Sequence, residues 1–113
     1  MAKPVNLWIW QHHNKYMKPG IYRHGASSCR LKYSPAIPAH LRGHMLEIMS
    51  IHTPESERGK GSASAMLIRV CNQATRDGKA LMLMPDTPEL ARWYERFGFK
   101  TVQESPLLMA RPA

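Results

Sequence analysis

The chain has 113 residues, which favours one domain over residues 1–113 with a single hydrophobic core. A hydrophobic share of 43% excludes a disordered chain, and no apolar run reaches the roughly 18 residues that a membrane-spanning helix needs. Two cysteines are too few for a disulfide framework and no secretion signal is recognised, so we expect a cytoplasmic protein.

The positive charge is concentrated in the first part of the chain. The net charge is +8, from 16 Lys and Arg residues against 8 Asp and Glu residues. Residues 1–46 contain no acidic residue, since the first carboxylate is Glu47. Because a surface of one sign attracts the opposite sign, we expect an acidic partner, such as an acidic peptide, a nucleic acid or a phosphorylated ligand. The alternative is that these basic side chains are simply solvated.

Secondary-structure signals are weak in this first part. Residues 5–10 alternate between apolar and polar side chains, which predicts a strand. Residues 11–19 are compatible with a short helix or a loop, and residues 28–33 predict another strand. Residues 34–43 contain two prolines and predict a loop.

The second part begins with a strand over residues 45–53 and a polar loop over residues 54–61. From Ser62 onward, apolar residues recur with the spacing of one helix face, at positions 63, 66, 67, 70, 71 and 74. Gly78 is a natural residue to end this helix, because glycine readily adopts the left-handed conformation required there. Cys71 lies on the apolar face, so we expect a buried thiol.

A short apolar run over residues 80–84 predicts a strand buried on both faces. Thr87 is the expected N-cap of a second helix that Gly98 ends, and residues 99–102 and 107–110 predict closing strands. This order predicts an α/β fold with a mixed sheet and a central right-handed βαβ unit. The glycine loop follows the carboxyl end of a strand, where such sheets bind ligands.

The glycine loop has the features of a phosphate-binding site. It comprises Arg58, Gly59, Lys60, Gly61, Ser62 and Ala63. The first turn of a helix leaves backbone N–H groups free and carries partial positive charge, and glycines let a phosphate approach closely. The spacing is neither that of a Walker A loop nor that of the dinucleotide-binding glycine motif. The alternative is an ordinary strand-to-helix turn flanked by charges.

The pattern Arg58-x-x-Gly61-x-Ala63 resembles the R/Q-x-x-G-x-G/A signature of the GNAT superfamily of N-acetyltransferases. Residues 46–53 line up without a gap on the family's preceding strand. Residues 90–99 resemble its second motif, a helix that carries Tyr94 four residues before Gly98. The two motifs occur in order over residues 45–102, so the chain is identified as a minimal GNAT-like domain with a shortened N-terminal half.

The resemblance implies acetyl-CoA as co-substrate and no metal. In the family, the pantetheine arm lies along the strand before the loop, which here would use the backbone of Ile51 and Thr53. The pyrophosphate would take N–H groups from Arg58 to Ala63. At the start of the second helix, Thr87 stands where the family often has an asparagine that contacts CoA.

The resemblance also implies direct attack of an amine on the acetyl group, with two proton transfers. Tyr94 matches the tyrosine that often protonates the CoA thiolate, although it also lies on an apolar helix face and could belong to the core. Glu47 aligns with a glutamate that serves as general base in some members, directly or through water; the alternative is a solvated strand carboxylate. His44 and His52 are further candidate bases.

The acceptor amine does not follow from the sequence, although the basic first part suggests an acidic or nucleic-acid-associated one. That part is shorter than the two-helix segment that normally shapes the family's acceptor site. The site would then be unusually open, or completed in a homodimer or larger assembly, or lost. The alternative function is therefore a GNAT-fold binding or structural subunit without turnover.

Two other sets of residues bear on function. All six histidines lie in the first half, without the spacing of a metal site. Aromatic residues interleaved with basic ones are typical of single-stranded nucleic-acid binding, but also of ordinary core strands beside solvated charges.

Overall fold

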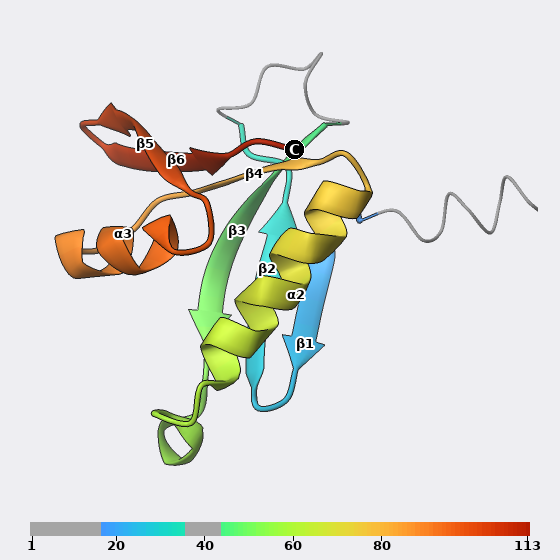
Figure 1. Cartoon of the computed structure of the whole chain (residues 1–113), viewed down its shortest axis with the longest axis vertical. Coiled ribbons are helices and arrows are strands. Elements are labelled where there is room, and N and C mark those ends of the chain that lie inside the picture. Colours follow the sequence, from blue (N-terminus) through green and yellow to red (C-terminus); the bar gives the residue numbers. More distant parts are fainter. Residues whose placement is uncertain (1–16, 36–43) are drawn as a thin grey trace, which may run out of the picture.

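A computed structural model describes residues 17–35 and 44–113. These residues form a mixed α/β structure with one six-stranded sheet (Figure 1). The strands are β1 (Gly20–His24), β2 (Ser27–Lys32), β3 (Met45–His52), β4 (Ala80–Leu83), β5 (Lys100–Glu104) and β6 (Leu107–Arg111). The helices are η2 (Glu55–Glu57, a 3-10 turn), α2 (Ser62–Arg76) and α3 (Pro88–Glu95). The strand expected over residues 5–10, and most of the segments 11–19 and 34–43, lie outside the described residues.

The strand order is β1-β2-β3-β4-β6-β5. Among the described strands, only β3 and β4 pair in parallel, and α2 connects them; the other neighbouring strands are antiparallel. This confirms the mixed sheet with a central βαβ unit. β1 was not predicted, because its Ile21 side chain is 63% exposed and the strand lacks the apolar alternation of a half-buried one.

The core forms where α2 packs against the sheet. Its inward face consists of Met66, Leu67, Val70, Cys71 and Ala74, all buried. Five of the six apolar positions predicted for this helix are therefore in the core, including the expected buried thiol of Cys71. The helix ends as expected, with Gly78 at a φ of 68°.

The second helix, α3, also begins as predicted. The Thr87 Oγ1 atom accepts a hydrogen bond from the Leu90 N–H at 3.1 Å, and Pro88 occupies the first turn. This is the arrangement of an N-cap that satisfies one of the free donors of a helix start. In the described part of the chain, no helix is long and apolar enough to cross a membrane.

Strands β3 and β4 pair over only three positions and then diverge, as Figure 1 shows. The last pair joins Glu47 to Met82, and β4 ends at Leu83. On its other side, β3 has a register shift against β2 close to Ser50, which has a φ of 56°. A bulge of this kind bends a strand, so the two parallel strands leave an opening toward α3.

Candidate active site

The opening between β3, β4 and α3 is a cavity of about 700 Å³, here called the main cavity. It is lined by Glu47, Ile48, Met49, Ser50, Ile51, Ala63, Leu83, Met84, Asp86, Leu90, Trp93 and Tyr94. The sheet opens where β3 and β4 stop pairing, and α3 closes the opening on one side. The main cavity therefore lies at the carboxyl ends of the parallel strands, where ligands bind in α/β sheets.

A smaller hollow of about 250 Å³ lies at the glycine loop, here called the loop hollow. It is lined by Thr53, Glu57, Arg58, Gly59, Gly61, Ser62, Ala63 and Ser64. Ala63 lines both spaces. An elongated molecule can therefore place one end in the loop hollow and reach into the main cavity past this small side chain.

The backbone of the loop suits an anion. Gly59 and Gly61 both have a φ of 79°, and a Cβ atom at either would meet no other atom within 4 Å. The first helical hydrogen bond of α2 runs from the Ala65 N–H to the Gly61 carbonyl at 3.0 Å. The preceding N–H groups, from Ser62 to Ser64, have no backbone acceptor among the described residues. Free donors, the helix dipole and open space coincide here.

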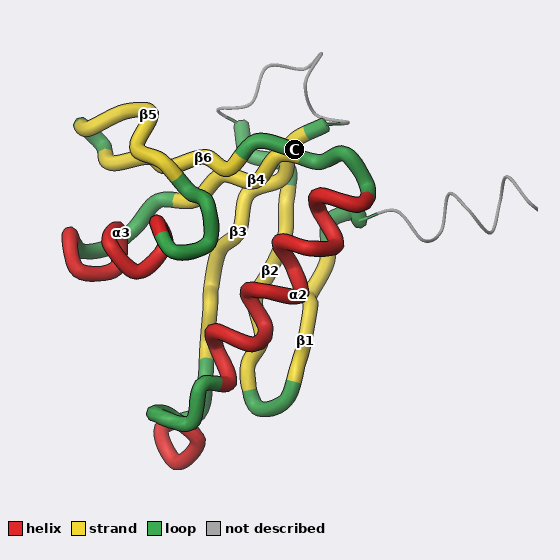
Figure 2. Tube along the Cα trace, viewed as in Figure 1, coloured by secondary structure: helices red, strands yellow, loops and turns green. Residues whose placement is uncertain are grey.

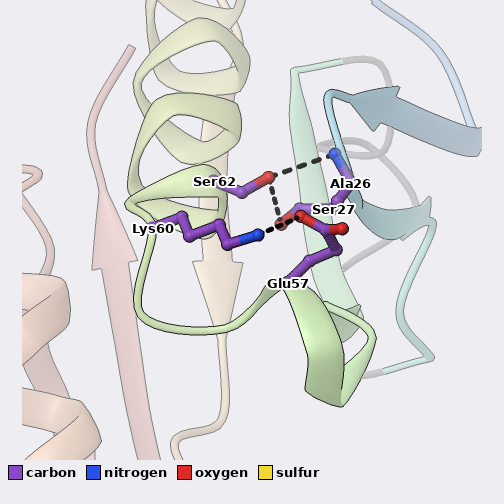
Figure 3. A network of polar contacts seen from close by, with 5 residues as sticks. All are labelled: Ala26, Ser27, Glu57, Lys60 and Ser62. Atoms are coloured by element: carbon purple, nitrogen blue, oxygen red, sulfur yellow. Dashed lines mark hydrogen bonds and ion pairs between the residues drawn. The ribbon is translucent and has the colours of Figure 1, made fainter.

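The two basic side chains of the loop each interact with a neighbouring group of the protein. The Arg58 Nε atom donates a hydrogen bond to the Thr53 carbonyl at 3.0 Å, which ties the loop to the end of β3. The Lys60 ammonium lies 3.2 Å from a Glu57 carboxylate oxygen (Figure 3). Because both partners of that ion pair are exposed, it holds Lys60 only weakly. The backbone N–H groups thus offer the more fixed contacts to an anion.

Ser62 has a different position from the one its place in the motif suggests. Its Oγ atom accepts hydrogen bonds from the Ala26 N–H at 3.2 Å and from the Ser27 hydroxyl at 2.9 Å (Figure 3). The Ser27 oxygen also lies 2.6 Å from Thr53 Oγ1. The side chains of Ser62 and Thr53 therefore fix the loop on the β1–β2 turn, which approaches the start of α2 (Figure 2). No sequence signal identifies this contact, because it joins residues 35 positions apart.

Tyr94 reaches the main cavity from α3 and is also part of the core. It is 8% exposed, and its ring packs against Trp93 and Phe99 at centroid distances of 5.0 and 5.9 Å. Burial raises its pKa above 10.0, and the negative charge of Asp86 adds to this effect. The phenol therefore remains a proton donor at neutral pH. Both interpretations of Tyr94 from the sequence are compatible with this position.

The candidate bases differ in position. Glu47 is 7% exposed and lines the main cavity at the point where β3 and β4 separate. His44 and His52 are exposed, and neither lines the cavity. Thr87 lines neither space and uses its hydroxyl as the cap of α3. The structure thus brings Glu47, Ile51, Ala63 and Tyr94 together.

Sequence reasoning did not single out several residues that line the main cavity. Asp86 precedes the α3 N-cap, and Leu90 and Trp93 were assigned to a buried helix face. Their periodicity was a correct signal for the helix, but it could not distinguish a core from a cavity wall. Among the described residues, no group of three or more His, Cys, Asp and Glu side chains is arranged to hold a metal ion.

The comparisons with known proteins give matches at the level of structure. No protein-family model and no curated protein matches the sequence. The structure of YhbS from Escherichia coli, a GNAT family N-acetyltransferase in complex with CoA, matches with a TM-score of 0.60 and 15% identity, covering 77% of this chain and 51% of that one. A candidate acetyltransferase, YncA from Salmonella typhimurium with its cofactor acetyl-CoA, matches with a TM-score of 0.61 and 13% identity, covering 99% and 73%.

A candidate acetyltransferase from Exiguobacterium matches with a TM-score of 0.58 and 15% identity, covering 77% of this chain and 54% of that one. The chain thus spans about half the length of this structure and of YhbS. Identities this low establish the fold, and the matches agree on it. The chain has the mixed α/β fold of the GNAT N-acetyltransferases.

Proposed function

We propose that this protein is an N-acetyltransferase that moves the acetyl group of acetyl-CoA to an amine. One observation carries the proposal: Ala63 joins a phosphate-sized hollow to a cavity that contains both a buried carboxylate and a buried phenol. Two solved structures with the same fold contain CoA or acetyl-CoA, which supports the choice of co-substrate.

The loop would hold the pyrophosphate through the N–H groups between Gly59 and Ala63, with Arg58 and Lys60 adding positive charge. The pantetheine arm would run along β3 beside Ile51 and Thr53. β4 no longer pairs with this part of β3, so the backbone on that side has hydrogen-bonding groups to offer. The thioester would then lie in the main cavity.

The chemistry requires one bond to form and one to break. The amine nitrogen forms a bond to the acetyl carbon, and the carbon–sulfur bond of the thioester breaks. Glu47 accepts the proton that the amine loses, directly or through water, and Tyr94 donates a proton to the departing thiolate. Burial raises the pKa of the Tyr94 phenol, so at neutral pH the phenol carries the proton that this role requires.

The expected acidic partner finds no support in the main cavity, whose described lining contains no Lys, Arg or His. A separate hollow of about 370 Å³ between β1 and α2 is lined by Arg23, Arg69 and Arg76, among others. An acidic or nucleic-acid partner would fit this surface better than the acetyl-transfer site. Such a partner, and assembly into a homodimer or larger complex, remain predictions of the sequence.

Calorimetric titration with acetyl-CoA tests the proposal. Ser64→Glu places a carboxylate in the loop hollow at a helix position that tolerates glutamate well, so the variant should fold. We expect acetyl-CoA to bind about 10-fold or more weakly, because the carboxylate repels the pyrophosphate. Asn72→Glu, which adds the same charge at an exposed position of α2, is the control.

The opposite outcomes are equally informative. A folded wild-type protein that binds no acetyl-CoA would contradict the enzyme proposal and favour a GNAT-fold binding or structural subunit. Binding that Ser64→Glu leaves unchanged would show that the pyrophosphate lies elsewhere.

A further inference from the structure

The main cavity is acidic although the chain as a whole is basic. It contains two carboxylates, Glu47 from β3 and Asp86 from the segment between β4 and α3. No basic side chain of the described residues lines it. The basic side chains of the described residues thus lie outside the space in which the acceptor would react.

Of the two carboxylates, Glu47 gives the stronger indication of a cationic ligand. The residue is 93% buried, since its exposed fraction is 7%, and it lines the cavity. Its backbone pairs with β2 and β4, but no hydrogen bond or ion pair joins its carboxylate to any described residue. A buried carboxylate is costly unless a donor or a cation faces it. Lys32 stands opposite Glu47 in the β2–β3 register but forms no ion pair with it, so the cavity is the open side from which a cationic partner can come.

Asp86 lies near the same reaction centre. Its charge is one cause of the raised pKa of Tyr94, so its field reaches the phenol that faces the thioester. A purely structural role is also available to it, because an acidic residue just before a helix stabilises the positive helix end. A test of Asp86 must therefore separate substrate recognition from stabilisation of α3.

The remaining wall of the cavity is apolar. Met84 and Leu90 are 49% and 37% exposed, and Trp93 packs edge to face on Phe97 with its ring centroid 5.0 Å away. Apolar side chains exposed in a cavity favour a ligand with an aliphatic section. An aromatic ring in the same wall also stabilises a nearby cation.

We propose that the acceptor is an aliphatic amine that carries a second cationic group, and that Asp86 binds this second cation while Glu47 faces the reacting amine. This inference rests on the proposed acetyl transfer. The reacting nitrogen loses its proton to Glu47 and forms the bond to the acetyl carbon. The second group keeps its proton and its charge throughout, so it serves only to position the acceptor.

Three acceptors of similar length test the charge preference: 1,5-diaminopentane, 1-aminopentane and 5-aminopentanoate. They end in a cation, a methyl group and an anion, respectively. We expect kcat/KM to fall in that order, by about 10-fold between the first two. Titration of the same amines into the protein–CoA complex gives the same comparison without turnover. Equal values for the diamine and the monoamine, or a preference for the anion, would overturn the proposal.

Two variants locate the recognition. Asp86→Asn should remove most of the preference for the diamine while leaving the affinity for acetyl-CoA unchanged. Glu89→Gln removes a carboxylate from the first turn of the same helix, outside the main cavity, and should keep the preference. If both variants lower the melting temperature alike and both keep the preference, Asp86 is structural and the proposal is wrong.

The affinity for acetyl-CoA reports the proposed function separately. A wild-type protein that binds acetyl-CoA but makes no distinction among the three amines contradicts only the present inference. A protein that binds no acetyl-CoA contradicts the proposed function, and titration of the amines against the protein alone then decides whether Asp86 selects a cation.

Discussion

The Ser27 hydroxyl donates a hydrogen bond to the Ser62 oxygen at 2.9 Å, and this bond joins the β1–β2 turn to the first residue of α2. Ser27 is 2% exposed, so water cannot replace the bond easily. Because Ser27 donates to Ser62, the Thr53 hydroxyl must be the donor in its own 2.6 Å contact with Ser27. The turn therefore positions the loop that would bind the cofactor without lining the loop hollow itself.

Replacing Ser27 by Ala should weaken acetyl-CoA binding although the residue does not line either cofactor space. The change leaves the Thr53 hydroxyl without its Ser27 partner, while Ser62 keeps only the hydrogen bond from the Ala26 N–H. We expect a cost of about 1–3 kcal/mol in the free energy of unfolding. Urea unfolding and calorimetric titration measure the two effects. Ser28→Ala, at the next position of β2, is the control and should change neither; equal effects of both variants would refute the link.

Tyr94→Phe should lower kcat about 100-fold, because the thiolate loses its proton donor. Acetyl-CoA affinity should hold, and stability should change little, since no described residue hydrogen-bonds this hydroxyl. Wild-type activity that depends on this proton should fall only above the usual tyrosine pKa of 10.0, because burial raises the pKa of Tyr94. Tyr33→Phe, at an exposed position, is the matched control. A Tyr94→Phe variant with full kcat would assign the residue to the core alone.

Glu47→Gln distinguishes the candidate bases. We expect a loss of about 100-fold in kcat at neutral pH, partly recovered near pH 9, where more of the amine is already deprotonated. Single His44→Ala and His52→Ala variants should retain wild-type rates, since neither side chain lines the main cavity. Initial rates with one amine acceptor measure all three. A large loss in a histidine variant, with Glu47→Gln active, would reverse the assignment.

The free energy of unfolding should fall as the pH rises from 9 to 11. Burial raises the pKa of the Cys29 thiol from 9.0 to about 11, with a further contribution from Cys71. The unfolded chain loses this proton near pH 9 and the folded chain near pH 11, so the stabilisation is complete below pH 9 and disappears across that window. Urea unfolding at several pH values measures it. The Cys29→Ala variant should be less stable at pH 8, but its free energy of unfolding should fall less as the pH rises. An equal fall in the variant and the wild type would show that other groups cause the pH dependence.

The sequence was sufficient to predict the position of the two described α-helices. Their apolar spacing, the Thr87 cap and the glycines after each helix are local signals, and the structure has each of them. The exposed edge strand β1 was not predicted because its side chains bury little apolar surface. For such a strand, pairing with β2 rather than its own pattern determines the conformation.

The candidate site could be predicted from the sequence only where its residues belong to a local motif. The glycine loop, Glu47 and Tyr94 could be named from the sequence, and the structure brings them to two adjoining spaces. The positive φ of Ser50 and the place of Asp86 in the cavity wall could not be predicted, because the first lies at the bulge between β2 and β3 and the second depends on how β3 and β4 separate. That separation is a property of the whole sheet and has no counterpart in any short stretch of residues.

The position of Ala63 between the two spaces has a consequence for how the proposed acyl donor would bind. Because the Ala63 methyl group lines both the loop hollow and the main cavity, an elongated molecule that occupies both spaces must pass over it. Ala63→Leu would leave the backbone of the anion-binding turn intact, so a nucleoside diphosphate would still bind. The larger side chain would block the passage, so the arm that carries the acyl group could not reach the main cavity. A substitution at this one position would thus distinguish binding of the donor's diphosphate from placement of its acyl group in the main cavity.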